Sequence, residues 1–116
     1  MEDAIMTGLI MSVVGLVMAV FGWLGFARRL PANAMIGIRL PATRVSDEAW
    51  EETHVAAGPW LILSGLIPFF AGVFILLMGA ALPEWTVLAA YAGMLIFVLV
   101  GTALGVRAAN AVNSSI

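Results

Sequence analysis

Hydrophobic positions along the chain fall into three long runs, and one polar stretch separates the first run from the second. The runs cover residues 4–27, 58–82 and 85–106, and none of them contains a charged side chain. Each is long enough to cross a hydrocarbon core of about 30 Å, which takes about 20 helical residues. The pattern predicts an all-α membrane protein with three transmembrane helices and a structured loop over residues 28–57.

Composition supports the same class. Hydrophobic residues make up 63% of the chain and charged residues 10%, against about 45–50% and about 25% in soluble domains. We therefore expect a lipid bilayer around residues 1–116, which are too few for a second folded domain. The absence of cysteine excludes disulfides and thiolate chemistry.

The positions of the arginines predict the orientation. Four arginines lie in the loop between the first two runs and the fifth follows the third run, so three crossings place all five on one side. The other side carries Glu2, Asp3 and Glu84. Because lysine and arginine in short loops set topology, we expect a cytoplasmic loop and C-terminus and an N-terminus outside.

Small residues recur at helical spacings within the runs. The first run has Gly8, Ser12, Gly15, Ala19 and Gly22, the second has Gly58, Gly65, Gly72 and Gly79, and the third has Gly101 and Gly105. Small residues let transmembrane helices approach closely. We expect them to pack a three-helix bundle, and a homo-oligomer is the alternative.

The polar loop contains the start of a further helix. Ser46 is a typical N-cap, and Asp47 and Glu48 follow it in the first turn, where the helix dipole favours acids. Trp50 and His54 then lie four residues apart on one face. We expect a short amphipathic helix that leads directly into the second span.

His54 admits three interpretations. It follows Glu51 by three residues, a spacing found in carboxylate metal sites, but such sites need several pairs, so Glu51 and His54 are weak metal candidates. A pH-sensing role is a second interpretation. We favour a structural role, in which His54 binds the loop backbone and forms one hydrogen-bonded cluster with Asn33 and Arg39.

Arg39 has two candidate partners. It can form an ion pair with Asp47, Glu48 or Glu51, or its planar guanidinium can bind a lipid phosphate. The remaining chemistry is sparse: the sequence has no glycine-rich phosphate loop, nucleophile elbow or paired intramembrane carboxylates. We therefore expect no enzyme activity, no cofactor and no direct binding of nucleic acid.

The loop also resembles a known family. Asn33, Ile36-Gly37-Ile38-Arg39, Pro41, Thr43, Ser46, Trp50, His54 and Gly58 are similar to the signature of the SdpI family of bacterial membrane proteins. The match lies within residues 33–58, and Leu40 stands where the family usually has threonine. The resemblance implies that the motif or binding residues are Asn33, Gly37, Arg39, Pro41, Thr43, Trp50, His54 and Gly58.

The resemblance also implies a biological setting. The family's namesake protects a bacterium from a secreted killing peptide and signals by drawing a transcriptional repressor to the membrane. We therefore expect a multi-pass protein of the bacterial plasma membrane with a protein or peptide partner, acting in immunity to a membrane-active toxin peptide or in membrane signalling. The alternatives are a structural accessory subunit of a larger membrane complex and, more distantly, a metal-dependent membrane enzyme.

Overall fold

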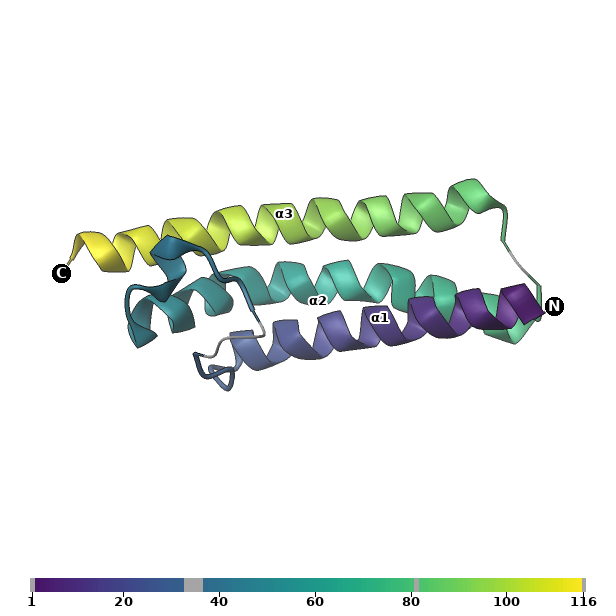
Figure 1. Cartoon of the computed structure of the whole chain (residues 1–116), viewed down its shortest axis with the longest axis horizontal. Coiled ribbons are helices and arrows are strands. Elements are labelled where there is room, and N and C mark those ends of the chain that lie inside the picture. The colour runs from purple at the N-terminus through teal and green to yellow at the C-terminus, as the bar shows by residue number, and fades with distance from the viewer. Residues whose placement is uncertain (1, 33–36, 81, 116) are drawn as a thin grey trace.

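The computed structural model describes residues 2–32, 37–80 and 82–115 of the chain. Its elements are α1 (Glu2–Phe26), the short 3-10 helix η1 (Pro41–Arg44), α2 (Asp47–Met78) and α3 (Glu84–Ser114) (Figure 1). Each of α1, α2 and α3 is long and apolar enough to cross a membrane. The predicted all-α membrane protein with three transmembrane helices is therefore confirmed.

The helix ends differ from the predicted spans. The expected amphipathic helix forms the first turns of α2 and runs into the second span without a break. At its other end α2 stops at Met78, short of residue 82, because Gly79 has a left-handed φ of 66° and caps the Ile75 carbonyl. The third helix continues past the predicted end at residue 106 to Ser114, through an alanine-containing sequence that favours helix.

The helix α2 occupies the middle of the fold. It packs against both α1 and α3, and no close backbone contact joins α1 to α3 within the described residues. Figure 1 shows this order, with the N-terminus at one end of the molecule and the C-terminus and η1 at the other. The predicted bundle is thus two helix pairs that share α2.

A seam of facing glycines joins α1 to α2. The pairs are Gly8 with Gly72, Gly15 with Gly65, and Gly22 with Gly58. A Cβ on Gly72 would lie 2.6 Å from the carbonyl oxygen of Gly8, so the two backbones are in direct contact. The predicted packing of small residues is therefore confirmed for these pairs. The prediction that Gly79 packs like Gly58, Gly65 and Gly72 is wrong, since a Cβ on Gly79 would meet no atom within 4 Å.

The third helix also packs on α2 through glycines, and these contacts lie in the N-terminal half of α2. A Cβ on Gly101 would lie 2.9 Å from Cβ of Trp60, and a Cβ on Gly105 would lie 2.8 Å from the Thr53 carbonyl oxygen. Both glycines are buried. The two predicted glycines of the third run thus serve packing inside one chain.

At the loop end of the molecule, α2 extends beyond the end of α1. A Cβ on Gly25, near the end of α1, would lie 2.8 Å from Cβ of His54, so α1 ends level with His54. The helix α2 extends seven residues further, to Asp47, which is about 10 Å at 1.5 Å per residue. We call the projecting part the cap: residues 28–32 and 37–46, the first two turns of α2 and the last two turns of α3.

Candidate functional site

The start of α2 is built as the sequence predicts. The Ser46 side chain accepts a hydrogen bond from the Ala49 amide at 3.0 Å, and Ser46 itself is extended, with φ −154°. Asp47 and Glu48 lie in the first turn, where carboxylates complement the helix dipole. The Ser46 N-cap fixes where α2 begins, and so it places Trp50 and His54 on the buried face of the helix.

Trp50 and His54 bind the backbone at the two ends of the loop. Trp50 Nε1 donates to the Leu30 carbonyl oxygen at 2.8 Å, and the Ile38 amide donates to His54 Nε2 at 2.9 Å. The two rings stack with centroids 4.4 Å apart, and both side chains are buried. The expected hydrogen bond between His54 and the loop backbone is present.

The protonation state of His54 follows from its partners. Its Nδ1 lies 2.7 Å from the Trp50 carbonyl oxygen, which can only accept, so Nδ1 carries the proton. Nε2 is then the acceptor for Ile38, and the ring is neutral. Both nitrogens are occupied, and the described residues contain no group of three or more His, Cys, Asp or Glu that could hold a metal ion.

Gly37 allows the loop to approach these two rings. Its φ is 110°, which favours glycine. A Cβ there would lie 2.8 Å from His54 Nε2 and 2.9 Å from two carbons of the Trp50 ring. A larger residue would therefore have to push the loop away from the pair that holds it.

Thr43 and Pro41 shape the turn after the loop. The buried Thr43 hydroxyl accepts from the Leu40 amide at 3.1 Å and lies 2.8 Å from the carbonyl oxygens of Ile38 and Leu40, either of which can accept its proton. Pro41 opens η1, where its fixed φ suits the first turn. Both motif residues thus build the backbone that meets His54.

Asn113 is a site residue that the sequence did not indicate. Its Nδ2 donates to the Ala42 carbonyl oxygen at 3.0 Å, so the last turns of α3 hold η1. The predicted third span ended before Asn113, and an isolated asparagine carries no sign of a partner 71 positions away. Asn113 could have been found only by predicting that the third helix continues past Arg107 and carries Asn113 in its last turn.

Of the predicted cluster of Asn33, Arg39 and His54, the described residues test only Arg39 and His54, and no hydrogen bond joins these two. Asn33 lies outside the described residues. Arg39 is exposed, and no hydrogen bond or ion pair joins it to any residue in the described ranges. Both nitrogens of His54 bind other partners, the amide of Ile38 and the carbonyl of Trp50. Gly58, the remaining motif residue, belongs to the glycine seam.

Glu51, one of the three carboxylates predicted to pair with Arg39, pairs with Arg28 instead, and Glu52 is a second partner of Arg28. Its Nη1 lies 2.6 Å from Glu52 Oε1 and 3.5 Å from Glu51 Oε2. The hydrogen bond and the charge of Glu52 raise the pKa of Arg28 above its ordinary value. The left-handed φ of 61° at Arg28 ends α1 and turns the chain at this point.

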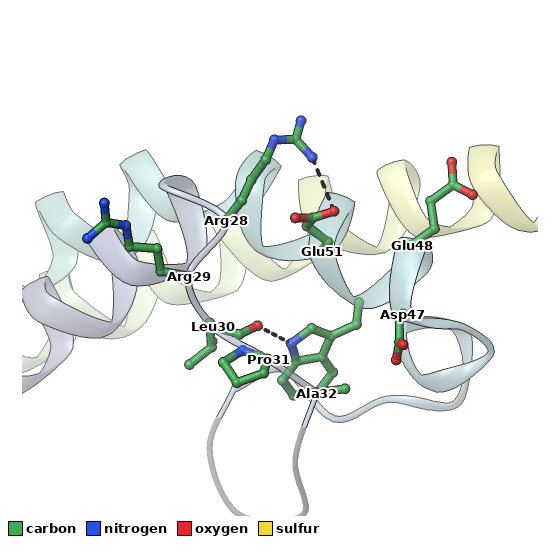
Figure 2. Close-up of a pocket in the computed structure, with 9 residues that line it drawn as sticks. Arg28, Arg29, Leu30, Pro31, Ala32, Asp47, Glu48 and Glu51 are labelled. Atoms are coloured by element: carbon green, nitrogen blue, oxygen red, sulfur yellow. Dashed lines mark hydrogen bonds and ion pairs between the residues drawn. The ribbon is translucent and has the colours of Figure 1, made fainter.

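An open cavity of about 610 Å³ lies where α1 stops and α2 continues (Figure 2). It is lined by Arg28, Arg29, Leu30, Pro31, Ala32, Asp47, Glu48, Trp50 and Glu51. Figure 2 shows Arg28 turned toward Glu51, while Asp47 and Glu48 leave the first turn of α2 in different directions. The guanidinium carbon of Arg29 lies 5.7 Å from the centroid of the Trp23 ring, a cation–π contact. The cavity therefore combines apolar surface with charges of both signs.

Comparison with protein-family models matches residues 29–108 to the SdpI/YfhL protein family. The matched part holds every described residue of the loop motif and nearly all of α2 and α3. No curated protein and no solved structure matches the chain. The resemblance inferred from the loop is thus confirmed over 80 of the 116 residues.

Proposed function

Since this chain belongs to the SdpI/YfhL protein family, we propose that it is an SdpI-like integral membrane binding protein. Its binding site is the cavity at the end of α1, beside the loop that Trp50 and His54 hold by hydrogen bonds. The proposed role is immunity to a membrane-active toxin peptide, or signalling at the membrane in response to one. The proposal contains no catalytic step. Its partner is a peptide that carries both cationic and apolar groups and lies at the membrane surface.

The observation that carries the proposal is the cavity at the end of α1. Asp47 and Glu48 are exposed at its rim and take part in no ion pair among the described residues. Leu30 and Ala32 supply apolar surface beside these two carboxylates. An amphipathic cationic peptide lies in the membrane interface with one apolar face and one charged face, so this pairing of carboxylates with apolar surface is complementary to it.

The rigid base of the loop also supports a binding role. Trp50 and His54 hold Leu30 and Ile38 by hydrogen bonds from buried side chains. A site that is held in one geometry before binding loses less conformational entropy when the ligand arrives. The structural role of His54 and a binding role for the surface beside it are therefore compatible.

A protection experiment tests this function. The chain is expressed in a bacterial strain that is sensitive to cationic membrane-active peptides, with an Asp47→Asn/Glu48→Gln variant and Glu84→Gln as the control. Glu84 begins α3 at the far end of the molecule. We expect wild-type and control chains to protect and the double variant to protect less. Equal sensitivity of cells with and without the wild-type chain would contradict the function.

The packing of α3 favours a second function, that of an accessory subunit in a larger membrane complex. Leu95, Ile96 and Leu99 on α3 are exposed, and no close backbone contact joins α3 to α1 within the described residues. Another membrane protein or a second copy of the chain can cover such a face. Purification in mild detergent separates the functions, because an accessory subunit brings a stoichiometric partner with it.

A further inference from the structure

We propose that residues 39–45 form a binding site for an anionic phospholipid at the membrane surface. The guanidinium groups of Arg39 and Arg44 bind the lipid phosphate, and the side chains of Leu40 and Val45 contact the adjoining apolar part of the lipid. The inference is independent of the toxin proposal, since it concerns the outer surface of the loop and η1 and not the cavity beside α1.

The depth of the segment is set by its attachment to the helices. Ile38 is bonded to His54, and His54 packs against Gly25 at the end of the apolar run of α1. Pro41, the first residue of η1, lies three positions after Ile38, so η1 begins within about 11 Å of that level. The headgroup layer of one leaflet is about 5–8 Å deep. The start of the segment is therefore within reach of the headgroup layer.

The two arginines of this segment have no protein partner among the described residues. Arg39 and Arg44 are exposed, and neither makes an ion pair within the described parts of the chain. Arg28, by contrast, is bound by Glu51 and Glu52. Guanidinium groups match phosphate geometry in a bidentate manner. Two unpaired guanidinium groups in a segment that begins within reach of the headgroup layer therefore favour a phosphate ligand.

The same segment also exposes apolar side chains. Val45 is 59% exposed and Leu40 is 42% exposed, whereas Thr43 between them is fully buried. Asn113 bonds the backbone of the segment to α3, and Thr43 closes the turn from Ile38 into η1. Its free surface thus combines apolar and cationic groups, which is typical of a surface that rests on anionic lipid. A free phosphate ion would leave Leu40 and Val45 without a partner, so we assign the site to a lipid.

The test uses the full-length chain in mild detergent and measures binding of phosphatidylglycerol and phosphatidylcholine by native mass spectrometry. We expect preferential binding of phosphatidylglycerol, with an affinity about 30-fold lower in Arg39→Gln/Arg44→Gln, which corresponds to about 1 kcal/mol for each arginine. Arg28→Gln is the matched control and should keep the preference, because Glu51 and Glu52 already neutralise Arg28.

Two further measurements keep the test decisive if the double variant folds poorly. Added salt should weaken the preference of the wild-type chain for phosphatidylglycerol, because salt screens exposed charges. Leu40→Ser/Val45→Ser should weaken binding of the lipid. Equal binding of the two lipids by the wild-type chain, displacement by inorganic phosphate alone, or an equal loss in Arg28→Gln would overturn the proposal.

Discussion

The glycine seam and the cap are two regions of one molecule that are held together by different interactions. In the seam, α1 and α2 touch through backbone atoms at three glycine pairs. In the cap, buried side chains bind named backbone groups: Trp50 binds Leu30, His54 binds Ile38, and Thr43 closes the following turn. Lipid provides no hydrophobic drive between helices, so close contact holds them, whereas a loop outside the hydrocarbon needs specific hydrogen bonds to keep one shape.

The two regions also differ in how specific their contacts are. The seam repeats the same contact every seven residues and offers little that distinguishes one partner from another. The cap uses one hydrogen bond at each of several unlike positions. Variants that damage one region and spare the other can therefore test whether the two contributions are independent.

The largest expected effect is in the seam. Gly72→Leu places a side chain where even a Cβ would lie 2.6 Å from the Gly8 carbonyl oxygen. We expect α1 to separate from α2, with a loss of more than about 3 kcal/mol in the free energy of unfolding, since overpacking a tight contact alone costs about 1–3 kcal/mol. Thermal unfolding in mild detergent measures it.

Gly93→Leu is the control for the seam. The nearest atom that a Cβ at this position would meet is Ile67 Cδ1, at 3.4 Å, the mobile end of a side chain. The control should keep most of the wild-type stability. Equal loss in both glycine variants would show that added bulk anywhere in the spans is harmful and that the seam has no special place.

His54→Ala should have the next largest effect and should act on the cap. It leaves the Ile38 amide without its acceptor, at a cost of about 1–3 kcal/mol for a buried group left unpaired. The Trp50 carbonyl keeps its hydrogen bond within α2. We expect faster trypsin cleavage after Arg39 and Arg44. Crosslinking between cysteines introduced into α1 and α2 should stay at the wild-type level, and its loss would show that cap and seam are coupled.

Acidification should reproduce part of the His54→Ala effect. Only neutral imidazole can accept the Ile38 hydrogen bond, because a proton on Nε2 would face the amide proton. The bond is therefore present at higher pH and is lost as the pH falls through the titration of His54. The protection factor for amide exchange at Ile38, which is the intrinsic rate divided by the observed rate, should fall on acidification in the wild-type chain and not in His54→Gln. A pH-independent protection factor in the wild type would refute the effect.

Asn113→Ala should have the smallest effect. It removes one hydrogen bond to Ala42, worth about 0.5–1.5 kcal/mol, and it also removes a buried Oδ1 that has no partner among the described residues. We expect faster amide exchange in η1 with little change in global stability. Asn110→Ala, at an exposed position on the same helix, is the control and should leave η1 unchanged.

Periodic features could be predicted from the sequence. Apolar length gives the three helices, small residues at spacings of three, four and seven give the seam, and a serine followed by two acids gives the start of α2. Each depends on residues close together in the chain. The shared face of Trp50 and His54 could be predicted for the same reason.

The partners of those side chains could not be predicted. Trp50 and His54 bind main-chain groups of Leu30 and Ile38, and every residue but proline has the same main-chain groups. The choice of Arg28 over Arg39 as the ion-pair partner depends on the left-handed turn at Arg28, which arginine does not favour. The orientation, the partner and a homo-oligomer stay predictions.

The bond between Asn113 and Ala42 has a consequence for biosynthesis. Its two ends are separated by 71 positions in the chain, so at about 5–20 residues per second the ribosome makes Asn113 about 4–14 s after Ala42. The three glycine pairs between α1 and α2 and the bonds of Trp50 and His54 join parts of the chain that are complete by Gly72. During that interval the nascent chain can assemble α1, α2 and the loop between them. The hydrogen bond from Asn113 to η1 can form only after the third helix has been inserted.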